Sequence, residues 1–312
     1  MSKQALIAAG GGAAGALLAA AAFSGLPGGV FLAYLAPLPL LLVGLSRGLN
    51  ALGLAAAAGI LVCVILGGVA SAAVFAALSA LPSWLIVHYA LKQRLDAATG
   101  KVEWQPLGHI VAVLALVVGF TMVSLGLTAA GGESMAATVR GQLQDSFTAS
   151  LPHMDPEMLV TLVDQLAPLF LGFSAAIWLF LVATNGMLAE NSLAARNWAI
   201  RPRPSWSAFA LPDWFAWPLV ITATIALVPS GDLQYLARNL VLVFAAAYLF
   251  QGLATVHTIS QGMQGQRLLL AALYFVLFIF SVIAAPLLAA LGMIDQWAGV
   301  RRRIAGQSRG WE

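Results

Sequence analysis

The sequence predicts an all-α fold, a polytopic transmembrane helix bundle with eight or nine membrane segments in a single integral membrane domain over residues 1–312. Hydrophobic residues make up 61% of the chain and charged residues only 9%, whereas a soluble domain has roughly 25% charged residues. The apolar runs are about 20 residues long, the length that a helix needs to cross the hydrocarbon core. They do not alternate at every second residue, so a transmembrane barrel is excluded.

Nine apolar segments are candidate membrane spans. The first follows Lys3 and is succeeded almost at once by a second, so we expect a retained first helix and not a cleaved signal peptide. The nine segments run over residues 5–23, 29–45, 49–67, 69–91, 107–130, 166–190, 214–229, 236–259 and 268–294.

The arginines and lysines of the connections predict the orientation, because positive residues favour the cytoplasmic side. With the amino terminus inside and nine crossings, nine of the 15 positive residues fall inside and six outside. The shortest segment, 214–229, is bounded by Pro218 and Pro229. If this segment lies shallow in the membrane or re-enters, thirteen positive residues fall inside and two outside. We therefore predict eight crossings with both termini in the cytoplasm.

Three segments are expected outside the spans. Residues 131–165 are predicted to be an extracytoplasmic insertion with an amphipathic helix, in which Asp155 is the N-cap and Pro156 the first helical residue. This helix is expected to lie on the membrane or to cover the mouth of the bundle, and a lid over a binding site is the alternative. Residues 191–213 are predicted to form a cytoplasmic interfacial elbow and 295–312 a basic cytoplasmic tail.

Tryptophan rings prefer the head-group zone, and prolines suit chain outside a regular helix. Asp213 is expected to cap the helix that follows it, because a carboxylate accepts hydrogen bonds from the free N–H groups at a helix start. The predicted interface anchors are Trp206, Asp213, Trp214, Trp217, Asp295 and Trp297.

No motif in the sequence indicates catalysis. The phosphate loop of nucleotide hydrolases, the H-E-x-x-H zinc motif and the G-x-S-x-G nucleophile motif are absent, and the four histidines lack metal-ligand spacing. We therefore predict a protein that is not an enzyme, with no catalytic residue, metal or cofactor. The single cysteine, Cys63, excludes a disulfide within the chain. The basic residues lie in connections and the tail, so no nucleic-acid partner is expected.

A few polar side chains lie inside the apolar runs. A buried amide without partners costs a few kcal/mol, so these groups should face other helices, water or a ligand. The default interpretation is that these groups form hydrogen bonds between helices. The alternative is that they face a ligand. In that case Gln251→Leu should abolish ligand binding without changing the folded yield. Glu190, at the end of its span, is interpreted as a solvated helix end. The candidate substrate-binding residues are Asn185, Asn239, Gln251, Thr255 and His257.

Short motifs in the last third of the chain carry a family resemblance. They are Leu211-Pro212-Asp213-Trp214, Asn239-Leu240, Gln251-Gly252-Leu253-Ala254 and Gly292-Met293-Ile294-Asp295. Together with the span pattern they resemble the YybS-like family of uncharacterised bacterial polytopic membrane proteins. That family is distantly similar to the S components of energy-coupling factor transporters, six-helix proteins that capture vitamins or metal-related solutes with a membrane coupling protein and two ATPases.

The resemblance implies a transport role and places coupling ATPase subunits among the expected partners. In S components a small-residue spacing on the first helix contacts the coupling protein, and Ala9 with Ala13, and Ala16 with Ala20, match that spacing. The chain departs from the S-component plan by two or three additional apolar segments after residue 213, which leaves the vitamin-capture role open.

The leading hypothesis is a transporter-like protein of the bacterial inner membrane that binds a small solute or lipid and has no ATPase site of its own. Its partners are expected to be the lipid bilayer and other membrane proteins. The alternatives are a scaffold that organises other membrane proteins without transport, and an intramembrane enzyme acting on lipid.

Overall fold

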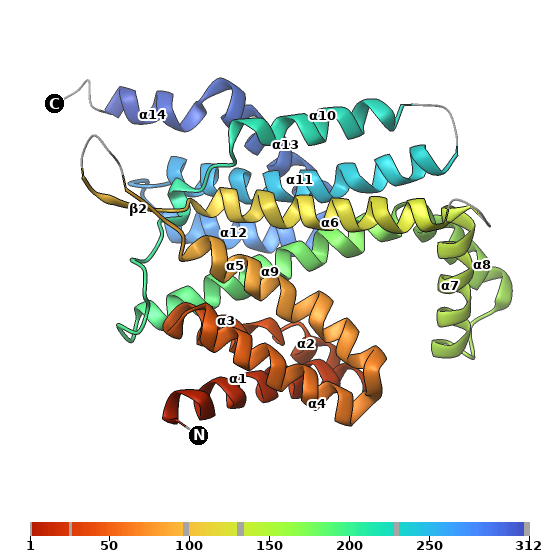
Figure 1. Cartoon of the computed structure of the whole chain (residues 1–312). Helices are drawn as coiled ribbons and strands as arrows, with labels where there is room; N and C mark the ends of the chain where they lie inside the picture. The colour runs from red at the N-terminus through yellow and green to blue at the C-terminus, as the bar shows by residue number, and fades with distance from the viewer. Residues whose placement is uncertain (1, 25–26, 96–99, 130–133, 228–230, 309–312) are drawn as a thin grey trace. The chain divides into compact units, whose positions relative to one another are not determined.

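The computed structural model describes residues 2–24, 27–95, 100–129, 134–227 and 231–308. The chain forms two compact units, the first from Met1–Leu114 and Phe180–Trp206 and the second from Ala115–Leu179 and Ser207–Glu312. Two of the three boundaries fall within long helices, α6 (Leu107–Ala129) and α9 (Phe170–Ala194), which Figure 1 labels. The third boundary falls in the 3-10 turn Trp206–Ala208. Each unit is described on its own.

The first unit is a helical bundle with one short hairpin. The strands β1 (Gln93–Leu95) and β2 (Val102–Trp104) pair antiparallel, with Arg94 opposite Glu103. The all-α prediction missed this hairpin, which lies in the basic connection between two spans. The helices are α1 (Lys3–Ala20), α2 (Gly29–Ala33), α3 (Pro37–Arg47), α4 (Leu49–Phe75) and α5 (Leu81–Ala90).

Glycines on α1 and α4 bring these two helices into close contact. A Cβ added at Gly12 would lie 1.9 Å from the carbonyl oxygen of Ala55, and one added at Gly59 would lie 2.8 Å from the carbonyl oxygen of Gly12. Interfaces between membrane helices favour such small residues because the backbones can then approach closely. The small residues of the first apolar segment therefore serve helix packing inside this unit, and Ala16 is fully buried there.

A break divides the long helical run Leu49–Ala90. Gly67 has non-helical backbone angles, and Gly68 has φ 73° and ψ −172°, a conformation that only glycine adopts readily. The sequence separates two spans, 49–67 and 69–91, at this same position, and the structure confirms a division there. A π-helical turn over Ala76–Ala80 joins the second part to α5.

The second unit is organised around the longest uninterrupted helix, α11, against which α10 and α13 pack. Twelve of the 28 residues of α11 are buried. The last helix, α14, forms the end of the described chain. Its helices are α7 (Met135–Ser150), α8 (Pro156–Leu166), α10 (Ala216–Ile225), α11 (Asp232–Ile259), α12 (Gln266–Ile279), α13 (Ser281–Ala298) and α14 (Val300–Ser308).

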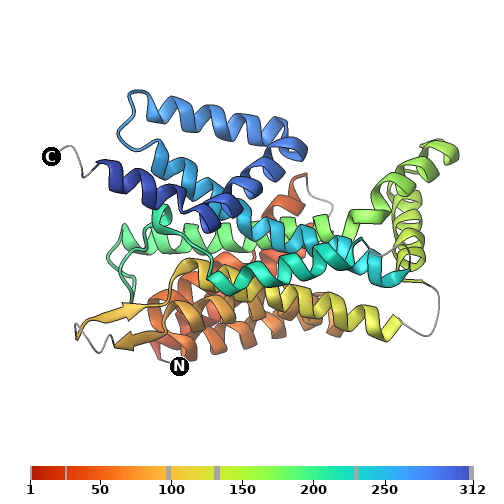
Figure 2. The ribbon, with the colours of Figure 1, turned by 90° about the horizontal axis from the view of Figure 1, so that it is seen from above.

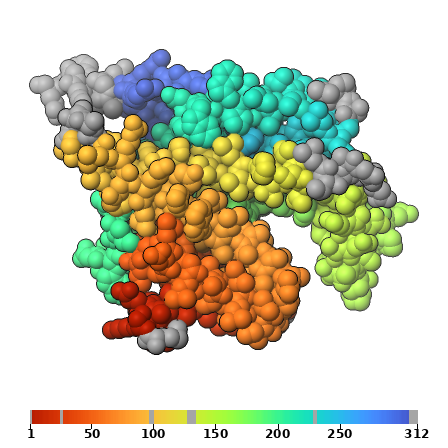
Figure 3. Space-filling view, viewed as in Figure 1, coloured from red at the N-terminus to blue at the C-terminus, as the bar shows by residue number. Residues whose placement is uncertain are grey.

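The predicted insertion consists of two helices, α7 and α8, that form one lobe of the second unit (Figure 3). The Asp155 side chain caps α8 by accepting from the amides of Glu157 (2.8 Å) and Met158 (3.3 Å), which confirms the expected cap. Helix α7 was not among the predicted elements. The shared core of the lobe contains Met135, Val139, Leu143, Leu159, Val163, Ala167 and Tyr235.

One predicted span differs in the structure. Residues 268–294 form two helices, because the backbone of Phe280 (φ −114°, ψ 37°) ends α12 and α13 runs back from it (Figure 2). In the described part of the segment 214–229, which was predicted to lie shallow or to re-enter, a 3-10 turn is followed by α10. This helix of ten residues is about 15 Å long and too short to cross a bilayer. In the described residues seven helical runs are long and apolar enough to span a membrane.

The expected cap at Asp213 was wrong. Asp213 is exposed and is itself the first residue of a single 3-10 turn, Asp213–Phe215, which has no side-chain cap. Pro212 occupies the capping position, and α10 begins directly after this turn at Ala216.

Candidate functional site

A small apolar cavity lies in the first unit between α5, the first turns of α6 and the end of α9. Its volume is about 20 Å³, enough for one water-sized molecule. One ionisable side chain, that of Glu190, contributes to a lining that is otherwise almost wholly apolar. The cavity is lined by Ile86, Leu107, Ile110, Val111, Leu114, Ala183, Gly186, Met187, Glu190 and Trp206.

Glu190 is buried beside this cavity and forms an ion pair with Arg201. The two residues are each 6% exposed, and Arg201 Nη2 donates to Glu190 Oε1. Arg201 Nη1 also lies within 3.3 Å of the carbonyl oxygen of Ala90 and 3.5 Å of that of Gln105. Arg201 therefore ties the end of α9 to the end of α5 and to the chain just before α6.

One oxygen of this carboxylate has no hydrogen-bond partner. Glu190 Oε2 is buried and unpaired, as is Arg201 Nε. Burying an ion pair is costly, and its remaining polar atoms are normally satisfied. An unsatisfied carboxylate oxygen at an apolar cavity is therefore an acceptor available to a ligand.

The sequence-based interpretation of Glu190 as a solvated helix end was wrong. The residue lies on the last turns of α9, which continues to Ala194, and the elbow folds back so that Arg201 reaches it. The sequence does contain a pattern that could have indicated the ion pair, namely an acidic residue inside an apolar run, followed by an arginine among prolines. That pattern does not specify that the two residues meet.

Asn185 lies one and a half turns before Glu190 on α9. Its Nδ2 donates to the carbonyl oxygens of Tyr34 and Leu181, both at 2.8 Å, whereas its Oδ1 is buried without a partner. The side chain thus joins α9 to the turn before α3. It does not line the cavity beside Glu190.

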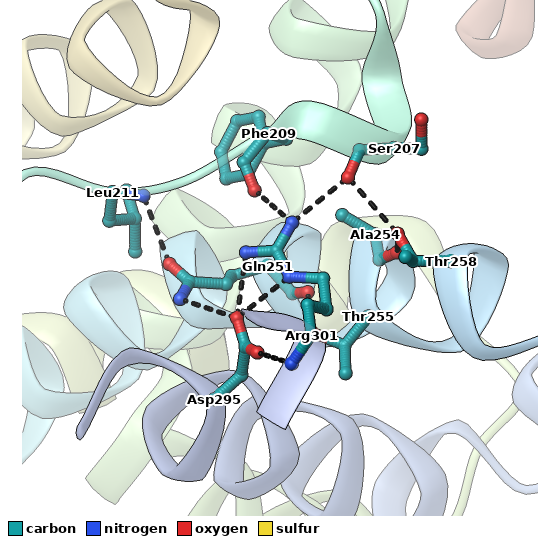
Figure 4. Close-up of polar contacts among 9 residues, drawn as sticks. All are labelled: Ser207, Phe209, Leu211, Gln251, Ala254, Thr255, Thr258, Asp295 and Arg301. Carbon is teal, nitrogen blue, oxygen red and sulfur yellow. Dashed lines mark hydrogen bonds and ion pairs between the residues drawn. The ribbon is translucent and has the colours of Figure 1, made fainter. Parts of the chain in front are cut away.

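In the second unit, a polar cluster forms around Gln251, Asp295 and Arg301 (Figure 4). Gln251 Oε1 accepts from the Leu211 amide at 2.9 Å, and Gln251 Nε2 lies 3.3 Å from Asp295 Oδ2. The structure thus joins a predicted binding residue to a predicted interface anchor. The same carboxylate binds Arg301, which was predicted only as part of the basic tail.

Arg301 links the end of the chain to the segment that precedes α10. Its Nε and Nη2 reach Asp295 Oδ2 at 2.8 and 2.7 Å, and its Nη1 donates to the carbonyl oxygens of Ser207 (2.9 Å) and Phe209 (2.8 Å). The cluster therefore fixes an irregular segment against α11 and α13. The polar groups of the cluster bind other groups of the protein, as a structural role requires.

The other predicted binding residues of the second unit are also engaged in the fold. Asn239 accepts from the Gly172 amide at 2.7 Å and donates to the carbonyl oxygens of Pro168 and Tyr235. Thr255 donates to the Gln251 carbonyl oxygen.

His257 Nδ1 lies 2.9 Å from the Leu253 carbonyl oxygen, and its Nε2 lies 3.5 Å from the hydroxyl of Tyr274. Asn239 and Gln251 are twelve residues apart on α11, about 18 Å along its axis, so the candidate residues on α11 do not form one cluster.

The predicted tryptophan anchors occupy different environments. Trp217 and Trp297 are strongly exposed, at 66% and 68%, and Trp214 is 40% exposed. Trp206 is half-buried and lines the cavity of the first unit.

No group of three or more histidine, cysteine, aspartate or glutamate side chains that could hold a metal ion occurs in the part of the chain that the structure describes. A family model described as "Predicted membrane protein (DUF2232)" matches residues 14–296. No curated protein and no solved structure matches the chain. The family match and the seven apolar helical runs identify a multi-pass membrane protein.

Proposed function

The chain belongs to the DUF2232 family of predicted membrane proteins, and we propose that it is a transporter-like protein that binds a small solute at the cavity beside Glu190. The observation that carries this proposal is the buried, unpaired Oε2 of Glu190 at an otherwise apolar cavity. An ionisable group inside a membrane segment is expensive, and its usual reason is a substrate or ion pathway.

The cavity favours a ligand that donates a hydrogen bond. Arg201 balances the charge of Glu190, so the pair presents an acceptor oxygen without a full net charge. The surrounding aliphatic and aromatic side chains favour a small apolar body around that donor. A solute larger than water needs the lining to move, and Met187 supplies a flexible side chain there.

In this proposal the protein lies in a bacterial inner membrane with eight crossings, is not an enzyme and has no ATPase site of its own. The resemblance to S components adds coupling ATPase subunits as candidate partners. Two pairs of alanines match the S-component spacing. Ala16 of the second pair is fully buried within its own unit. Ala9 and Ala13 of the first pair are partly exposed and are therefore more accessible to a partner.

The scaffold role remains the second candidate, and α12 is the observation that favours it. None of the residues of α12 is buried, and Leu268, Phe275 and Phe278 are each at least 65% exposed. Acyl chains can cover this helix, and so can another membrane protein. Stable membrane partners after purification in mild detergent, without a retained solute, would favour the scaffold.

The test is mass spectrometry of small molecules released from the protein after purification in mild detergent. A Cβ at Gly186 would have only Ile86 atoms nearby, at 3.9 Å, so Gly186→Leu places a side chain in the cavity and keeps both residues of the ion pair. Gly53→Leu is the matched control, because Gly53 is an exposed helical glycine of the same unit with open space around it. The solute should be retained by the wild type and by Gly53→Leu, and lost from Gly186→Leu and Glu190→Gln. Absence of any solute from the wild type, or its retention by Gly186→Leu, contradicts the proposal.

A further inference from the structure

We propose that the end of the second unit where α13 meets α14 binds the head groups of anionic phospholipids. Arg302 and Arg303 supply the contacts to the phosphate, and Trp214, Trp217 and Trp297 set the depth in the membrane. This lipid site is independent of the solute site in the first unit.

The turn between α13 and α14 is rigidly held. Gly299, in the left-handed conformation (φ 62°), donates its amide to the Asp295 carbonyl oxygen at 2.9 Å and ends α13. The Arg301 amide then donates to Asp295 Oδ1 at 3.0 Å, in addition to the contacts of the Arg301 guanidinium. The first turn of α14 is therefore fixed to α13, and the residues that follow have defined positions.

Asp295 and Arg301 neutralise one another, and two arginines remain. Arg302 and Arg303 are exposed, and neither forms an ion pair with a carboxylate among the described residues. The Arg302 guanidinium lies close to Gly299, 3.2 Å from an added Cβ, so it folds back over the turn. The exposed Asp213, in the 3-10 turn Asp213–Phe215, carries one negative charge against the two positive charges of Arg302 and Arg303.

Exposed tryptophans surround the same end of the unit. Gln296 Nε2 donates to the Pro212 carbonyl oxygen at 3.1 Å, which places the end of α13 beside the 3-10 turn that carries Trp214. Trp217 follows in the first turn of α10. Indole rings prefer the head-group zone, where one edge is wet and the ring is covered by lipid. Unpaired arginines are costly in the hydrocarbon but stable at this level.

Phosphate is the ligand that this combination fits best. The planar guanidinium binds phosphate oxygens with two parallel hydrogen bonds, and it is less strongly hydrated than an ammonium group. A negatively charged phospholipid adds a favourable surface potential that a zwitterionic lipid lacks. The two adjacent arginines next to interfacial tryptophans thus match an anionic head group.

The test is native mass spectrometry of the full chain with a mixture of phosphatidylglycerol and phosphatidylethanolamine. The wild type should retain phosphatidylglycerol preferentially, and Arg302→Gln/Arg303→Gln should lower that preference roughly tenfold. Both side chains are exposed, so the variant should elute as a folded, monodisperse particle.

The matched control is Arg94→Gln/Arg140→Gln, which also removes two positive charges, one from the β1–β2 hairpin and one from α7. It should keep the preference of the wild type. Equal losses in the two double variants would show that net charge alone attracts the lipid, and an unchanged preference in Arg302→Gln/Arg303→Gln would show that these arginines do not bind it. Either result overturns the proposal.

Discussion

Gly252 on α11 and Gly292 on α13 lie where the backbones of these two helices are in close contact. A Cβ added at Gly252 would lie 1.9 Å from the Leu288 carbonyl oxygen, and one added at Gly292 would lie 2.2 Å from the Tyr248 carbonyl oxygen. The obstacles are backbone atoms, which cannot rotate away. The separation of the two helices therefore depends on both residues being glycine.

Gly252→Ala and Gly292→Ala should each lower the melting temperature of the purified protein. Forcing a methyl group into a packed interface costs about 1–3 kcal/mol. We expect a cost near the upper limit at these two sites, because the methyl group would meet backbone atoms. Gly141→Ala in α7 is the control, because nothing lies within 4 Å of its added Cβ. It should be neutral or stabilise by about 0.5–1 kcal/mol. Equal melting temperatures for all three variants would contradict the close packing.

Asp295→Asn should destabilise the second unit strongly, because it leaves Arg301 without its counter-ion. The Asp295 and Arg301 side chains are only 4% and 15% exposed, and breaking a buried pair from one side costs about 3–5 kcal/mol. The comparison is Asp164→Asn, which breaks the half-exposed pair between Arg140 and Asp164 and should cost at most about 1 kcal/mol. Thermal unfolding of both variants in the same detergent measures the difference.

Gln251→Leu should lower thermal stability and not only ligand binding. The change leaves the Leu211 amide without its acceptor and removes a donor from Asp295, at a cost of about 1–3 kcal/mol. The sequence alone led us to expect an unchanged folded yield, and the contacts of the amide group now predict the opposite. Gln261→Leu, at an exposed position in the turn after α11, should unfold at the wild-type temperature. A Gln251→Leu protein as stable as the wild type would rule out the structural role.

Asp155→Ala should loosen the start of α8. Loss of an aspartate cap costs typically about 1 kcal/mol, so hydrogen exchange of the amides of Glu157 and Met158 should become faster. Asp155→Asn keeps an acceptor oxygen and should restore most of the protection. Exchange in α11 should not change in either variant, and a uniform increase over the chain would indicate a different cause.

The sequence was sufficient to locate most spans, because a continuous apolar run of membrane length has few alternatives. It also placed the α4 break at Gly67–Gly68 and the α8 cap at Asp155, where single residues decide local geometry. It missed α7, whose apolar side chains recur at every fourth residue but are diluted by many polar ones. That helix depends on contacts with α8 and Tyr235 that no local pattern reveals.

The division between α12 and α13 could not be read from the sequence, since Phe280 is neither glycine nor proline. Pro286, the one proline of that segment, lies within α13 and does not end it. The pair of Glu190 and Arg201 was missed for a related reason. Its two members are separated by an irregular elbow, and only the path of that elbow brings them together.

The lobe formed by α7 and α8 has a consequence for experiments on this 32.5 kDa chain. Two hydrogen bonds join the lobe to α11. The Met135 amide donates to Asp232 Oδ1, and the Tyr235 hydroxyl donates to the Ala167 carbonyl oxygen. An antibody fragment raised against this lobe would therefore bind an epitope whose position relative to α11 is fixed. It would give single-particle microscopy the alignment mark that a small protein in a micelle otherwise lacks.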